Sequence, residues 1–176
     1  MNSQKQFKRR FSFEFFPPKT DVGAEKLQIV RDELAKRKPD FFSVTYGAGG
    51  STQERTINTV LKFQDQGIST APHISCVGST KENIAALLDH YKKHGVTRIV
   101  ALRGDLPSGM GSTGELRYAN DLVEFIRTHS GDHFNIEIAA YPEMHPQAPS
   151  VEADLLNFKK KVDAGANSAI TQYFYN

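Results

Sequence analysis

The chain has 176 residues, of which 39% are hydrophobic and 24% charged, a composition typical of a folded domain rather than a disordered or fibrous chain. Its 22 basic and 20 acidic residues leave a net charge of +2, which gives no argument for nucleic-acid binding. No apolar run approaches the roughly 20 residues of a membrane span, and residues 1–10 form a polar leader unlike a secretory signal. The single Cys76 excludes an internal disulfide, so we expect a cytoplasmic protein without membrane partners.

After this leader, short strand-like runs alternate with helical segments. Strands are predicted at residues 11–16, 41–46, 69–77, 97–102, 134–141 and 168–175. Between them, apolar residues recur at helical spacing, which predicts helices at residues 24–36, 53–66, 81–94, 118–128 and 151–164. Gly67, Gly95 and Gly165 follow three of these helices, at the position where a left-handed residue commonly ends a helix.

Repeated strand–helix units are typical of parallel sheets with right-handed crossovers. An open doubly wound sheet and a barrel of eight such units both fit the α/β pattern, and six strands do not decide between them. Eight-unit barrels usually need about 250 residues. A barrel would therefore have about two units missing here. No internal boundary interrupts residues 11–176, so we expect one domain.

Ligands of parallel α/β folds lie at the carboxyl ends of the strands, and polar residues gather there in this sequence. Glu14 stands among aromatic residues, where a costly ionisation would raise its pKa and suit a general acid; the alternative is an outward glutamate paired with a lysine. The glycines at 47–50 match neither a dinucleotide fingerprint nor a phosphate loop, and they also fit a plain turn. A lone histidine such as His73 is more often a core or surface residue than a ligand.

The fourth strand ends in Arg103, Gly104 and Asp105, a placement that suits a site more than a structural salt bridge. Three glycines within residues 108–114 predict either a mobile lid or a plain connection. In the last helix, Asp154, Asn157 and Lys161 fall on one side and either line a ligand groove or form a solvated stripe.

Taken together, these segments resemble the methylenetetrahydrofolate reductase family. The resemblance rests on motifs that occur in order from residue 11 to the end: residues 13–18, 44–48, 71–73, 101–107, 140–146, 154–157, 161–166 and 170–172. It implies a (β/α)₈ TIM barrel, of which about six of eight units are present. It also implies FAD as cofactor, with hydride passing from NADH or NADPH to FAD and then to methylenetetrahydrofolate, giving methyltetrahydrofolate.

The resemblance also implies roles for individual residues. Glu14 corresponds to the general acid that helps to open the folate ring, Asp105 to a carboxylate near both flavin and pterin, and Gln172 to a pterin-binding residue. Thr45 is also implied to face the nicotinamide. The positions matching flavin contacts are Thr45, Tyr46, Ala48, His73, Arg103, Gly104, Asp105, Tyr118, Ala119, Tyr141, His145, Ala148, Asp154, Asn157, Lys160 and Lys161.

The sequence departs from the family pattern in two ways. Lys160 stands where an arginine is expected. The compact ammonium of a lysine binds phosphate oxygens with a less defined geometry than the planar guanidinium of an arginine. The last two strand–helix units, which supply further folate-binding residues, are not in the sequence. We expect a homo-oligomer with a folate substrate and no metal. The alternatives are another barrel enzyme, such as a lyase or aldolase, and a half-barrel that binds flavin without turnover.

Overall fold

The computed structural model describes residues 10–46, 50–105 and 114–175. Six strands alternate with five helices in these residues, in the order that the sequence predicts. The elements are β1 Ser12–Phe15, α1 Asp21–Ala35, β2 Phe41–Val44, α2 Gly50–Asp65, β3 Thr70–Ser75, α3 Lys81–Lys93, β4 Arg98–Leu102, α4 Ala119–Ser130, β5 Asn135–Ala140, α5 Val151–Asp163 and β6 Ser168–Thr171.

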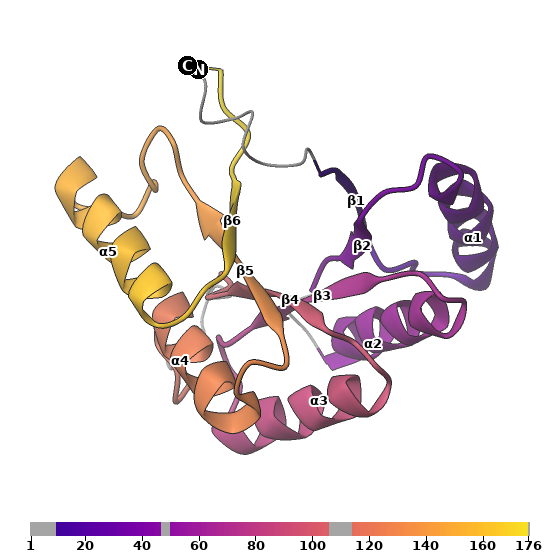
Figure 1. Cartoon of the computed structure of the whole chain (residues 1–176), viewed down its shortest axis with the longest axis horizontal. Helices are drawn as coiled ribbons and strands as arrows, with labels where there is room; N and C mark the ends of the chain where they lie inside the picture. Colours follow the sequence, from indigo (N-terminus) through magenta and orange to yellow (C-terminus); the bar gives the residue numbers. More distant parts are fainter. Residues whose placement is uncertain (1–9, 47–49, 106–113, 176) are drawn as a thin grey trace.

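The six strands form one parallel sheet in the consecutive order β1-β2-β3-β4-β5-β6. A doubly wound sheet reverses its strand order at a switch point, so the consecutive order excludes that alternative. In Figure 1 the helices line the outer side of the curved sheet, and β1 and β6 lie at its two ends. This arrangement is that of a partial (β/α)₈ barrel, which we call the half-barrel.

The outer face of the sheet packs against the helices through apolar side chains. Phe15 of β1, Phe42 of β2 and Phe63 of α2 are buried and meet edge to face, with ring centroids 5.2 to 6.1 Å apart. Ile99 of β4 and Ile136 of β5 continue this core under the later helices. Successive strand residues point to opposite faces, so the residues between these apolar positions point into the barrel.

The inner face carries polar residues at the amino-terminal end of the strands. The guanidinium of Arg98 donates to the buried carboxylate of Glu137 and, over 3.1 Å, to the amide oxygen of Asn135. Ser168 of β6 donates to the other oxygen of Glu137, and Arg98 lies over the ring of Phe41, 4.6 Å from its centroid. This network joins β2, β4, β5 and β6 below the carboxyl ends of the strands.

Helix ends follow the predicted capping chemistry. Gly67, Gly95 and Gly165 have φ values of +76°, +73° and +110°, which confirms the predicted left-handed positions after α2, α3 and α5. No helix in the described ranges is long and apolar enough to cross a membrane.

Three predicted boundaries are wrong by three residues or more, and one of them is the start of α2, at Gly50 rather than at residue 53. Helix α1 begins at Asp21 rather than at residue 24, because the Thr20 side chain accepts a hydrogen bond from the Gly23 amide and caps the helix. Strand β6 ends at Thr171 rather than at residue 175. Its pairing with β5 stops where β5 itself ends, at Ala140.

Candidate active site

Glu14 and His73 approach each other across the inner face of the half-barrel. Glu14 lies on β1 and His73 on β3, and His73 Nε2 is 3.8 Å from Glu14 Oε2. The side chain of His73 is 10% exposed, and its Nε2 has no hydrogen-bond partner in the described part of the chain. The Glu14 side chain is 50% exposed and faces the open interior.

The environment of Glu14 differs from the one that the sequence suggests. Phe13 and Phe15 turn to the helix-covered face and pack against Phe42, so their rings do not flank the carboxylate. Desolvation nevertheless raises the pKa of Glu14, as predicted, although the flanking rings are turned away from the carboxylate. Burial lowers the pKa of His73 to about 4, so this imidazole is neutral at neutral pH.

The ends of β3 and β4 are joined at Ser75, Arg103 and Gly104. Ser75 Oγ donates to the Arg103 carbonyl over 2.9 Å, and the Val77 amide donates to the same carbonyl over 3.0 Å. Gly104 has a φ of +85°, and a Cβ on it would lie 1.9 Å from Ser75 Oγ. Only glycine fits there, because Ser75 occupies the space that a Cβ would take.

The guanidinium of Arg103 links β4 to the segment after β5. It donates to Gln147 Oε1 over 2.7 Å. In that segment the rings of Tyr141 and His145 meet with centroids 4.4 Å apart, and the His145 amide donates to the carboxylate of Asp154 over 2.9 Å. His145 Nδ1 accepts from the Gln147 amide over 3.0 Å, so the N–H of the ring is on Nε2.

Lys161 is the partly buried cation of α5. Its ammonium donates to the Ala139 carbonyl at the end of β5 and lies 5.5 Å from the centroid of the Phe158 ring. Burial lowers the pKa of Lys161, while the carboxylate of Asp154 opposes this shift. The structure therefore brings Asp154 and Lys161 to the same end of the barrel as Tyr141 and His145.

The other predicted site residues lie after β2, β4, β5 and β6 or on α4 and α5. Thr45 and Tyr46 follow β2, and burial raises the pKa of the Tyr46 phenol against the effect of a hydrogen bond with Ser79. The amide oxygen of Gln172 accepts from the Tyr173 amide next to it. Asp105 is exposed after β4, and Tyr118 and Ala119 lie at the start of α4. The Ala148 amide donates to the His145 carbonyl. Asn157 and Lys160 are exposed on α5.

Three predictions fall on residues that the structure does not describe. Ala48 lies outside the described residues, as does the glycine-rich segment 108–114 apart from Gly114. The leader, residues 1–10, is described only at Arg10.

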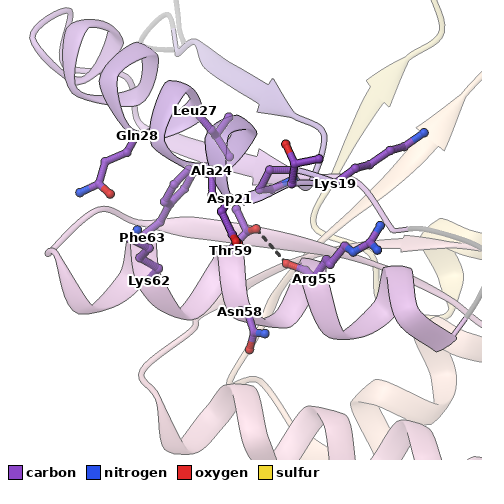
Figure 2. Close-up of a pocket in the computed structure, with 12 residues that line it drawn as sticks. Lys19, Asp21, Ala24, Leu27, Gln28, Arg55, Asn58, Thr59, Lys62 and Phe63 are labelled. Atoms are coloured by element: carbon purple, nitrogen blue, oxygen red, sulfur yellow. Dashed lines mark hydrogen bonds between the residues drawn. The ribbon is translucent and has the colours of Figure 1, made fainter.

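A cavity of about 290 Å³ lies away from these residues, in a groove between α1 and α2 (Figure 2). Ala24 and Leu27 of α1 and Thr59 and Phe63 of α2 contribute to its lining. None of the predicted site residues lines this groove, so it is separate from the carboxyl-end site.

Sequence reasoning missed three residues that shape the site. Ser75 and Gln147 hold Arg103; Ser75 is a polar residue at the end of β3, whereas Gln147 lies in the segment after β5 and gave no signal. Met144 has a φ of +102°, which is unusual for a residue with a side chain and marks strain in the segment after β5. Nothing in the sequence indicates this conformation.

The chain matches a known protein family over its whole length. The model of the methylenetetrahydrofolate reductase family matches residues 1–176. The chain belongs to the methylenetetrahydrofolate reductase family. The resemblance drawn from the motifs is thereby confirmed.

Relatives of this family come from bacteria and plants. The chain is 46% identical over 166 residues to the 5,10-methylenetetrahydrofolate reductase of Escherichia coli K12, covering 94% of this chain and 55% of that protein. The Buchnera aphidicola enzyme from Acyrthosiphon pisum is 46% identical over 167 residues, with 94% and 56% covered. Arabidopsis thaliana methylenetetrahydrofolate reductase (NADH) 1 is 40% identical over 180 residues, with 94% and 30% covered. The chain thus spans about half the length of these bacterial reductases.

Proposed function

We propose that the protein takes part in the reduction of methylenetetrahydrofolate to methyltetrahydrofolate, with FAD as cofactor and NADH or NADPH as reductant. The observation that carries this proposal is Glu14, a carboxyl of raised pKa on the inner face of the half-barrel, in a chain of the methylenetetrahydrofolate reductase family. The name of the Arabidopsis relative favours NADH as the reductant.

The residues at the carboxyl ends fit FAD. Gly104 lets Ser75 pack against the end of β4 and hold the Arg103 carbonyl, which fixes the position of Arg103 at this end of the barrel. Arg103 and Lys161 supply positive charge for phosphate oxygens, and His145, whose Nδ1 accepts from the Gln147 amide, offers a donor at Nε2. FAD, when bound, would supply hydride transfer between nicotinamide and folate.

Glu14 would act on the folate. Opening the bridging ring of methylenetetrahydrofolate requires a proton on its leaving nitrogen, and a carboxyl with a raised pKa holds one closer to neutral pH. The half-exposed side chain faces the interior, where a substrate is accessible to it. Asp105 would favour the iminium cation that ring opening leaves, and Gln172 and Thr45 would hold the pterin and the nicotinamide.

The test is to follow flavin absorbance in the FAD-loaded protein, with the E. coli relative as reference. We expect NADH to bleach the flavin and methylenetetrahydrofolate to restore its colour. Bleaching without folate-dependent recovery would favour a flavin-binding half-barrel without turnover. A preparation that binds no flavin would favour another barrel enzyme, such as a lyase or aldolase.

We also propose that the chain self-associates and acts in the cytoplasm. All four residues of β6 are exposed, and Leu155 and Leu156 of α5 are 64% and 54% exposed. Exposed apolar side chains of this kind favour association with a second copy. Sedimentation velocity tests this, and a monomer at high concentration would contradict it. Cys76, buried as a free thiol, supports a reducing compartment.

A further inference from the structure

His73 and Glu14 face each other on the inner side of the half-barrel, with Nε2 and Oε2 3.8 Å apart. This contact joins two strands that are separated by β2, and it brings together the acid of the proposed reaction and a buried imidazole. The His73 Nε2 atom is buried without a partner in the described part of the chain. A buried polar atom of this kind costs free energy, so its orientation toward a carboxyl needs an explanation.

We propose that His73 is a positioning residue for Glu14. Its Nε2–H donates to one oxygen of the Glu14 carboxyl, and the other oxygen is thereby turned to the substrate with the acidic proton. The inference rests on the proposed function, because it assigns Glu14 the acid role. The inference concerns the Nε2 atom of His73 alone. The other atoms of the ring stay available for the flavin contact that the family resemblance implies.

The geometry allows this hydrogen bond with a small movement. The present distance of 3.8 Å exceeds a normal hydrogen bond by less than about 1 Å. The buried ring of His73 is fixed by its surroundings, while the half-exposed Glu14 side chain is free to rotate. Glu14 is therefore the partner that moves.

A neutral histidine suits this role, and a charged one does not. An imidazolium next to Glu14 would hold the carboxyl in its ionised form and remove the acid. Burial keeps His73 neutral down to a pKa of about 4, so it can orient the carboxyl without a full positive charge.

Other groups around the pair do not compete for this role. The neighbouring strands place uncharged Ser43 beside Glu14 and Val100 beside His73. The guanidinium of Arg103, at the end of β4, is turned to Gln147 and to the Gly104 carbonyl. Desolvation is the sole cause of the pKa shift of each member of the pair.

The first measurement is the tautomer of His73 in the isotope-labelled chain without cofactor. At neutral pH we expect the ring nitrogen resonances of His73 to show the proton on Nε2. The exposed His90 serves as the reference ring in the same spectrum. A proton on Nδ1 of His73 would overturn the proposal, because Nε2 then has nothing to donate.

The second measurement is the pKa of Glu14 from its carboxyl carbon resonance in wild type and variants. His73→Leu keeps the site apolar but removes the donor, and a lost donor disfavours the carboxylate. We therefore expect the pKa of Glu14 to rise by about 0.5 or more. His73→Gln keeps an N–H donor and should restore the pKa to near the wild-type value.

His133→Leu is the matched control, because His133 Nε2 contacts the Val96 carbonyl and not Glu14. It should leave the pKa of Glu14 unchanged. An unchanged pKa in His73→Leu, or an equal rise in His73→Gln, would refute the positioning role. None of these readouts needs FAD or turnover. A failure of flavin recovery with folate would therefore overturn the proposed function and not the pair.

Discussion

Gly104 stands at the end of β4 with a left-handed φ of +85°, and its replacement by alanine tests how tightly the ends of β3 and β4 are joined. The left-handed backbone costs a residue with a Cβ roughly 1–2 kcal/mol. The new Cβ would lie 1.9 Å from Ser75 Oγ and 3.0 Å from Ser75 Cβ, an overlap of the kind that typically costs about 1–3 kcal/mol. Ser75 must then turn away and lose its hydrogen bond to the Arg103 carbonyl, at roughly 0.5–1.5 kcal/mol.

Gly104→Ala should therefore lower the free energy of unfolding by about 3–6 kcal/mol, a large share of the stability of a typical domain. Urea unfolding followed by far-ultraviolet circular dichroism measures this, since the chain has no tryptophan. Gly67→Ala is the control, because Gly67 has a similar φ of +76° with nothing within 4 Å of a Cβ. It should cost only the backbone part, about 1–2 kcal/mol.

Combining Gly104→Ala with Ser75→Ala separates the overlap from the backbone cost. Without the Ser75 hydroxyl the closest obstacle is gone, so the double variant should be more stable than the sum of the single effects by about 1 kcal/mol or more. If Gly104→Ala destabilises the protein no more than Gly67→Ala does, the close approach of β3 and β4 is refuted.

Four further predictions concern charge and catalysis. Glu14→Gln in the FAD-loaded protein should leave flavin reduction by nicotinamide near normal but slow folate-dependent reoxidation by at least ~10²-fold in stopped flow; equal slowing of both steps would make Glu14 structural. Because folding lowers the pKa of His73 from 6.5 to about 4, the unfolded chain binds a proton at this residue at a higher pH than the folded chain does. The free energy of unfolding should thus decrease by up to about 3 kcal/mol between pH of about 6.5 and 4, and by less in His73→Gln; identical pH profiles in urea unfolding would contradict this. Glu137→Leu should cost about 3–5 kcal/mol by leaving the Arg98 charge unpaired, and the double variant with Arg98→Leu should recover most of it in the same assay; a double variant as unstable as the single one would refute the pairing. Asp105→Asn should make bound flavin easier to reduce, and an unchanged reduction potential would place Asp105 away from the flavin.

The order of the elements could be predicted because strand and helix periodicities differ and glycines mark the helix ends. The architecture needed more, since barrel and doubly wound sheets share the same local pattern, and only the pairing of strands separates them. Boundaries failed where side chains or neighbouring strands decide them. The Thr20 cap lengthens α1, and the end of β5 limits β6 although residues 172–175 remain rich in aromatic residues.

The candidate site, too, could be predicted only in part from the sequence. Glu14 was identified from its place at a strand end, but its real surroundings are His73 and the open interior rather than the flanking phenylalanines. A histidine on a strand gives no sign of what faces it two strands away, because that contact depends on sheet curvature and register. Ser75 and Gln147 contact Arg103, which is 28 and 44 residues away from them in the sequence. Only the folded chain brings these residues together.

Helix α5 carries Asp154, Asn157, Lys160 and Lys161 but contains no buried residue. An element with so little buried apolar surface opens locally at small free-energy cost, so its amides should exchange with solvent well before those of β4. A dinucleotide that bridges α5 and β4 would bind only the closed form and would raise the protection of α5 by mass action. The affinity for such a dinucleotide would then partly measure how well α5 is folded, and substitutions that stabilise α5 far from the ligand should tighten binding without adding a contact.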